Sequence, residues 1–173
     1  MTEHINHIPV VPLRGLTVFP GMSVHFDVIR MKSIEGIQQA MLAGQKVFLI
    51  RQKDEKVEEP DKDALCHGGV LAEIRQVVRV PQKGIRVMVY GEKRAILREF
   101  REANGFWEGD ISIYPEKCPD LPEGVTLEGM KKVLTDALKQ YAIRTKRVPE
   151  GVIQDILKID DAYTMAAEAA AGI

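Results

Sequence analysis

Cysteine is scarce in this chain of 173 residues, which contains only Cys66 and Cys118. The two are far apart and neither belongs to a C-x-x-C pair, so they cannot supply a four-cysteine or a cysteine–histidine zinc site. A secreted domain of this size is commonly rich in disulfides. We therefore predict two free thiols and a reducing, cytoplasmic location.

The chain also lacks an excess of charge of either sign. Its 24 basic and 25 acidic residues give a formal net charge of -1. A general nucleic-acid binder usually has a basic excess, because neutralising phosphates supplies most of its non-specific affinity. The charge balance therefore argues against a nucleic-acid partner. Hydrophobic residues make up 45% of the chain and charged residues 28%, which is typical of a globular protein rather than a disordered one.

Long apolar runs are missing as well. The longest, Val47 to Ile50, is far shorter than the run of about 20 residues that a transmembrane helix needs. The first residues, MTEHINHIPVVPLRG, have neither the positive nor the apolar region of a signal peptide. We expect a soluble, intracellular protein with no membrane partner.

Motifs for catalysis and cofactor binding are absent too. The chain has no G-x-x-x-x-G-K-[ST] loop for phosphates, no G-x-G-x-x-G turn and no G-x-S-x-G nucleophile motif. His4, His7, His25 and His67 lack metal-ligand spacing, and the first two fall in an end that we expect to be frayed. The sequence thus predicts no catalytic residue, no cofactor site and no metal site in this chain.

What the chain does contain, over its first two thirds, is a series of strand-like segments with one helix between them. Ser23 to Ile29 alternates apolar and polar residues, which predicts a strand. Ser33 is placed to cap a helix that runs to about Ala43. Val47 to Ile50 predicts a strand buried on both faces. Residues 51–69 are polar and indicate a surface loop with room for one helical turn.

The clearest secondary-structure signal is a β-hairpin. Apolar residues stand at the even positions Val70, Ala72, Ile74, Val78 and Val80, and Pro81 to Gly84 forms a turn. The second strand alternates apolar Ile85, Val87 and Val89 with Arg86, Met88 and Tyr90. Further strands are predicted at Arg94 to Arg101 and at Trp107 to Tyr114, where Trp107, Ile111 and Ile113 share a face. Several short, mostly antiparallel strands indicate a compact, barrel-like sheet.

The last third is predicted to be helical. Pro115 to Pro122 is rich in proline and marks a boundary, so we divide the chain into a β-rich lobe, 1–117, and a helical lobe, 118–173. Thr126 is placed to cap a long amphipathic helix, and a second helix includes Val152 to Leu157. A third, alanine-rich helix begins after Asp160 or Asp161 and has little to pack on, so we expect the chain to be cut short there. The predicted fold class is α+β.

Two apolar features are candidates for function. The segment Pro12 to Met22 holds apolar side chains among turn-forming residues; it is either a core-forming strand with a tight turn or a loop partly exposed for grasping polypeptide. On the hairpin, Met88 and Tyr90 stand beside Arg86 on the face away from the core. Methionine suits adaptable apolar recognition, but a second layer of structure covering this face would explain the pattern equally well. The candidate binding residues are Phe19, Pro20, Met22, Arg86, Met88 and Tyr90.

Several stretches of the chain match, in order, the motifs of one known family. IPVVPLRGLTVFPGM and RMKSIEGIQQAM resemble the opening and the start of the first helix of the amino-terminal domain of Lon proteases. The likeness continues through Gln52-Lys53-Asp54, Gly69-Ala72-Ile74, Pro81-Gly84 and Val89-Gly91-Arg94. The helical tail is similar more loosely, with Tyr163-Thr164 and an alanine run where the family often has leucine and aspartate.

The resemblance implies a PUA-like β lobe, followed by a helical lobe, that recognises unfolded, misfolded or regulatory proteins. It also implies a cytosolic homo-hexameric protease driven by ATP and Mg²⁺, with a serine–lysine catalytic pair in later domains. None of the nucleotide-binding or catalytic residues of that family lies in this chain, so the fragment by itself is not expected to be an enzyme.

Two other functions stay open at this stage. One is a stand-alone protein with the same β lobe that binds a small molecule or an adaptor. The other is an RNA-binding module, which rests only on analogy with PUA-like folds and is disfavoured by the charge balance.

Overall fold

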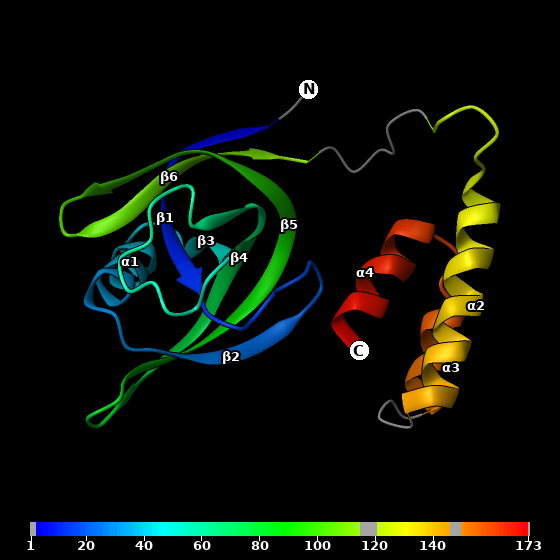
Figure 1. Ribbon diagram of the computed structural model, residues 1–173. Coiled ribbons are helices and arrows are strands. Elements are labelled where there is room, and N and C mark those ends of the chain that lie inside the picture. Colours follow the sequence, from blue (N-terminus) through cyan, green and yellow to red (C-terminus); the bar gives the residue numbers. More distant parts are fainter. Residues whose placement is uncertain (1–2, 115–120, 146–149, 173) are drawn as a thin grey trace. The chain divides into compact units, whose positions relative to one another are not determined.

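The computed structural model describes residues 3–114, 121–145 and 150–172. By its internal contacts the chain divides into two compact units, Met1–Pro115 and Glu116–Ile173 (Figure 1). Within the described residues, the first unit combines six strands with one helix and the second has three helices, so the fold is α+β as predicted. Cys118 and the predicted boundary after residue 117 lie outside the described residues. Among the described helices, none has the length and apolar character needed to cross a membrane.

One sheet holds all six strands of the first unit. Its elements are β1 (His4–Leu13), β2 (Ser23–Val28), α1 (Met31–Leu42), β3 (Lys46–Gln52), β4 (Leu65–Val80), β5 (Gly84–Ala103) and β6 (Phe106–Ile113). The strand order is β2-β5-β4-β3-β1-β6, and β5 also pairs with β6. Five strands therefore close into a ring, while β2 is added to β5 outside it. All pairs are antiparallel except β1 with β3, which is parallel.

Two apolar cores lie on opposite faces of the central strands. In β3, Phe48 and Ile50 point into a core that the five ring strands share, while Val47 and Leu49 point into another. That second core also contains Ile37 of α1 and residues of β2 and the first half of β5. The continuous apolar run of β3 is thus buried on both faces, as predicted.

The hairpin of β4 and β5 is confirmed, with one error in its pattern. Ile85, Val87 and Val89 are buried, and their alternation with outward-facing residues is as expected. Val78, however, is 46% exposed rather than turned to the core. A bulge between Ile74 and Gln76 shifts the pattern by one residue, so the side chains beyond it change face.

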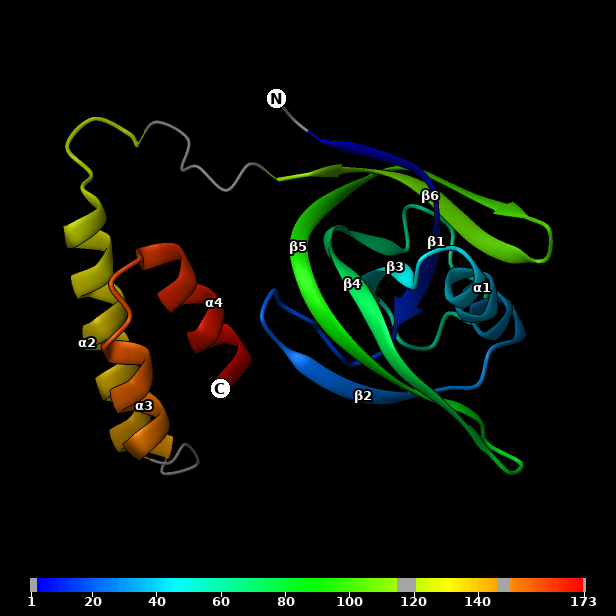
Figure 2. The ribbon, with the colours of Figure 1, turned by 180° about the vertical axis from the view of Figure 1, so that it is seen from behind.

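The two strands predicted at Ile85 to Val89 and at Arg94 to Arg101 are one strand, β5. It runs beside β4 along much of its length, with β2 on its other side at one end and β6 at the other (Figures 1 and 2). Bulges in the β4–β5 ladder let this strand bend from one core to the other. The loop after β3 is also shorter than predicted and holds no helix, because β4 already begins at Leu65.

Helix α1 begins without the predicted cap. Arg30 is its N-cap residue, and no side chain caps the helix there. Ser33 is instead 2% exposed inside the helix, so the prediction that it caps α1 is wrong. The sequence pattern did not distinguish the two cases, because a serine before a periodic apolar run can either cap a helix or lie inside it at a buried position.

The expectation of a frayed amino-terminal end is wrong as well, because His4 and His7 belong to β1. His7 Nδ1 lies 3.0 Å from Glu108 Oε1, to which it donates when protonated, and 2.8 Å from Arg101 Nη2, from which it accepts when unprotonated. Its backbone N–H donates to Asp110 Oδ1 at 2.9 Å. The hydrogen bond from Arg101 lowers the pKa of Asp110 to about 2. Long-range pairing of β1 with β6 therefore orders residues that look like a loose end in the sequence.

The second unit contains α2 (Leu127–Thr145), α3 (Glu150–Leu157) and α4 (Ala162–Gly172). Thr126 Oγ1 accepts the Gly129 N–H at 3.1 Å, which confirms the predicted cap of α2. Asp161 caps α4 by accepting the Thr164 N–H at 2.7 Å. Helix α4 does have something to pack on, contrary to our expectation: its Met165 is fully buried in a small core of this unit.

Candidate functional site

The two segments singled out in the sequence lie next to each other in the first unit. The turn from Phe19 to Met22 rests on Gly91 of β5, which directly follows Tyr90. Gly21 N–H donates to the Gly91 carbonyl and Gly91 N–H donates to the Met22 carbonyl, both at 2.9 Å. A Cβ at Gly91 would lie 2.3 Å from the carbonyl oxygen of Phe19, so only glycine permits this approach.

The turn is both anchored and partly open. Val18, just before it, is 7% exposed and belongs to the core, and Met22 packs against the same core. Phe19, Pro20 and Met22 are each half-buried. The Phe19 N–H donates to Met22 Sδ at 3.3 Å, which fixes the two ends of the turn to each other. The segment thus combines the core contact of one interpretation with the partial exposure of the other, and its role in binding stays a prediction.

Arg86, Met88 and Tyr90 form a row on the outward face of β5. Residues paired across strands point to the same side of a sheet, so their neighbours on this face follow from the register. Met88 lies between His25 of β2 and Gln76 of β4. Both neighbours are exposed polar residues, and Met88 itself is half-buried between them.

Tyr90 is flanked in the same way by Ser23 and Glu73. The guanidinium carbon of Arg75 lies 5.6 Å from the centroid of its ring, within the range of a cation–π contact. Met88 and Tyr90 therefore lie side by side, half-buried, on the outward face of β5. The Phe19–Met22 turn contacts β5 at the next residue, Gly91, with Met22 packed against the core. We call these five residues, Phe19, Pro20, Met22, Met88 and Tyr90, the apolar patch.

Arg86 is not a free cation beside this patch. Its Nε and Nη2 atoms donate to Asp27 Oδ1 and Oδ2 at 2.7 and 3.0 Å. These bonds lower the pKa of Asp27 and raise the pKa of Arg86. Arg86 therefore borders the patch as a neutral ion pair.

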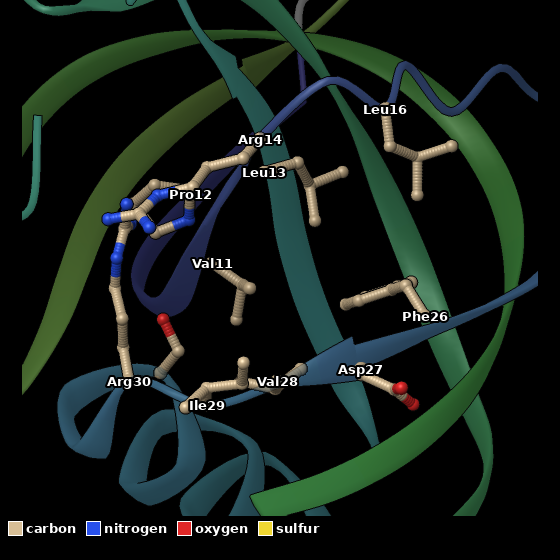
Figure 3. A pocket seen from close by; sticks show the side chains of 11 residues that line it. Val11, Pro12, Leu13, Arg14, Leu16, Phe26, Asp27, Val28, Ile29 and Arg30 are labelled. Atoms are coloured by element: carbon tan, nitrogen blue, oxygen red, sulfur yellow. The ribbon is translucent and has the colours of Figure 1, made fainter. Parts of the chain in front are cut away.

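A pocket that sequence reasoning missed lies between the end of β1 and β2, with a volume of ≈ 140 Å³ (Figure 3). Arg14 and Arg30 line it together with mostly apolar residues. Their side chains meet at one end of the pocket, and Leu16 and Phe26 lie toward the other. No local motif signals this site, because the pairing of distant strands brings its walls together.

The described residues contain no group of three or more His, Cys, Asp or Glu side chains that could hold a metal ion. Cys66, in β4, is a free thiol. The ionic cluster of His7, Arg101, Glu108 and Asp110 is fully explained by its mutual hydrogen bonds, and nothing in its geometry points to a reaction.

Comparison with known proteins gives a consistent result. Residues 7–173 match the family described as the ATP-dependent protease La (LON) substrate-binding domain. The Lon protease of Clostridium acetobutylicum is 35% identical over 158 residues, which are 91% of this chain and 20% of that protein. Lon protease 1 of Bacillus subtilis is 33% identical over 167 residues, 96% of this chain and 21% of that protein. The chain thus spans about a fifth of the length of these relatives.

Two solved structures share the fold. The N-terminal domain of a Mycobacterium avium complex Lon protease matches with a TM-score of 0.52 at 15% identity, covering 99% of this chain and 100% of that one. The Lon N-terminal domain protein from Xanthomonas campestris matches with a TM-score of 0.52 at 15% identity, covering 96% of this chain and 98% of that one. At this identity the likeness concerns the fold alone.

Proposed function

Since the chain belongs to the family of the substrate-binding domain of ATP-dependent Lon protease, we propose that it holds exposed apolar segments of unfolded, misfolded or regulatory proteins. In this proposal the domain cleaves nothing itself. It presents the captured segment to the parts of a longer protein that unfold and cut it.

The whole protein is proposed to be an ATP- and Mg²⁺-dependent serine protease of the cytoplasm that works as a homo-hexamer with a serine–lysine catalytic pair. The relatives named above, of which this chain covers about a fifth, support the protease, and the free thiol of Cys66 fits a reducing compartment. We also infer that the ring of five strands is the small PUA-like barrel implied by the family resemblance.

The observation that carries the proposal is the apolar patch. Met88 and Tyr90 are outward-facing on β5, where the residues on either side of them in the register are polar. The Phe19–Met22 turn adjoins the end of this row, held by its two backbone hydrogen bonds to Gly91, and its Phe19, Pro20 and Met22 are half-buried. Flexible sulfur-containing side chains beside aromatic rings accept apolar groups of many shapes, which suits a domain that binds many clients.

The test is binding of one fluorescently labelled protein, in native and in chemically unfolded form, to the chain and to its Met88→Asp variant. We expect only the unfolded form to bind, and the substitution to weaken that binding about tenfold. This is the order of the loss expected when a half-buried apolar contact, worth about 1.5 kcal/mol, is replaced by a solvated charge. Because Met88 points away from the core, the variant is expected to keep the fold.

Val133→Asp is the matched control, since Val133 is another apolar side chain, 70% exposed, on α2. It should leave binding unchanged. Equal affinity of the wild-type chain and Met88→Asp for the unfolded protein would remove the patch from the proposal. Failure of every form to bind would count against the proposed function itself.

A further inference from the structure

The pocket between β1 and β2 lies along two strand edges that have no partner in the sheet. Among the described strands, β2 pairs only with β5. The last residues of β1, Val10 to Leu13, pair with β3, whereas the pairing of β1 with β6 ends at Pro9. The sheet is therefore open between the end of β1 and β2.

The lining of the pocket confirms that it follows these edges. It includes four consecutive residues at the end of β1, Val11 to Arg14, and five around the end of β2, Phe26 to Arg30. Side chains of consecutive strand residues alternate between faces, so a pocket lined by such runs borders the backbone of both strands. An unpaired edge offers its free N–H and C=O groups to an added strand.

The size and character of the pocket suit one apolar side chain. Its volume of ≈ 140 Å³ is close to that of an engineered cavity of about 150 Å³ that accepts benzene. Leu13 and Val28 form its buried wall, and Leu16 and Phe26 are half-buried beside them. Ile29, at its rim, is 73% exposed.

One end of the pocket is lined by two arginines that form no ion pair within the described residues. Arg14 and Arg30 both donate to the same neutral acceptor, the carbonyl oxygen of Val57, at 3.3 and 3.1 Å. Neither arginine takes part in an ion pair with any described carboxylate. Asp27, the acid in the pocket lining, is bound by Arg86.

Arg30 is only partly satisfied by hydrogen bonds: its Nη2 donates to Gln52 Oε1 at 2.5 Å and to the Val57 carbonyl oxygen. Its Nη1 atom is buried with no hydrogen-bond partner, and the guanidinium carbon lies 5.8 Å from the ring centroid of Trp107. Burial, and then the charge of Arg14, lower the pKa of Arg30, while the charges of Glu59 and Glu58 act in the opposite direction. Two like charges held together beside an apolar pocket favour the approach of an anion.

We propose that this seam binds the carboxyl-terminal residue of a client polypeptide, with its apolar side chain in the pocket, its α-carboxylate on Arg14 and Arg30, and its backbone along the edge of β2. The apolar wall and the two arginines lie side by side in one pocket, so its ligand must carry an apolar group and a negative charge close together. A terminal leucine or phenylalanine has both on one residue. An internal aspartate or glutamate offers the charge without the apolar group. This inference rests on the proposed function in taking the ligand to be a client, but it concerns a different site from the apolar patch.

The test uses the whole chain and a labelled peptide of polar sequence that ends in leucine, with a free carboxylate in one form and an amide in the other. We expect the free acid to bind at least tenfold more tightly than the amide, the range for hydrogen bonds to a charged group. Arg14→Gln should lower the affinity for the acid toward that for the amide, since Arg30 remains, and leave the affinity for the amide unchanged. Arg14 is exposed, so its loss is not expected to disturb the fold.

Arg94→Gln is the matched control, because Arg94 is exposed on β5 and is not among the residues of the pocket. It should bind both peptides as the unchanged chain does. A second readout is the emission of Trp107, the one tryptophan, which should change with the acid and not with the amide because Arg30 lies over its ring.

The inference is overturned if the acid and the amide peptide bind equally tightly, or if neither peptide binds while an unfolded protein still does. Either result leaves the proposed function standing. Competition by N-acetyl-leucine as strong as that of the whole peptide would also overturn the inference, since the site would then serve a small carboxylate. If neither the peptides nor the unfolded protein bind, the proposed function fails together with the inference.

Discussion

Gly91→Ala tests the close backbone contact between β5 and the Phe19–Met22 turn in the candidate site. Gly91 lies where the Phe19–Met22 turn crosses β5, and an added Cβ would lie 2.3 Å from the carbonyl oxygen of Phe19. The obstructing atom belongs to the backbone, so no side-chain rotation can relieve the contact. The turn must move away from β5 by about 1 Å to restore van der Waals distance.

The expected loss of stability follows from what this movement breaks. Two backbone hydrogen bonds of 2.9 Å flank the contact, and each contributes about 0.5–1.5 kcal/mol net. We therefore expect Gly91→Ala to reduce the free energy of unfolding by about 1–3 kcal/mol. With a urea dependence of about 1–3 kcal/mol per molar, the unfolding midpoint should fall by about 1 M.

The assay is urea unfolding followed by the fluorescence of Trp107, which lies in β6 and reports on the first unit. Gly68→Ala is the control: it makes the same change in β4, where the nearest atom to the added Cβ is 4.0 Å away. We expect the free energy of unfolding of the control to differ from that of the unchanged chain by less than about 0.5 kcal/mol. If the two variants unfold at the same urea concentration, the close approach of the turn to β5 is wrong, and with it the geometry of the apolar patch.

Three further predictions concern the framework. Arg101→Gln should raise the pKa of Asp110 from about 2 toward its usual 3.8, as read from the NMR titration of its carboxyl group. Because the folded-state pKa is depressed, the contribution of Asp110 to stability is present above about pH 4 and is lost as the pH falls through 2; an acid unfolding curve unaltered by Arg101→Gln would contradict this. Phe48→Ala, at a fully buried position, should destabilise the first unit by about 3–5 kcal/mol in the same urea assay, and a loss below 1 kcal/mol would refute its place in the core. Asp161→Ala should cost the helical unit about 1 kcal/mol by removing the cap of α4, measured as a lower thermal midpoint in circular dichroism, whereas Asp160→Ala should have little effect.

Local patterns predicted those parts of the fold that depend on local chemistry. The β4–β5 hairpin and the doubly buried β3 follow from the alternation and the continuity of their apolar residues. The cap at Thr126 follows from the side-chain chemistry of a helix start. These features need no knowledge of distant residues, which is why sequence reasoning found them.

The wrong predictions concern features that depend on contacts between residues far apart in the chain. The bulge beside Ile74 turns Val78 outward because β4 must bend between two cores, and no residue type in this stretch indicates a bulge. His7 is ordered only through its contacts with β5 and β6. In the candidate site, the outward position of Met88 was predictable from alternation, but the contact of the turn with Gly91 was not. The Arg14–Arg30 pocket depends on where strands end rather than on any motif.

The most direct test of the account is to map where an unfolded polypeptide contacts this chain, by following amide chemical shifts during a titration. The account predicts shifts that cluster at Phe19 to Met22 and at Met88 to Tyr90, and none with the same polypeptide in its native state. Shifts confined to the helical unit, or equal shifts with the native and unfolded forms, would contradict the claim that the apolar patch holds unfolded clients.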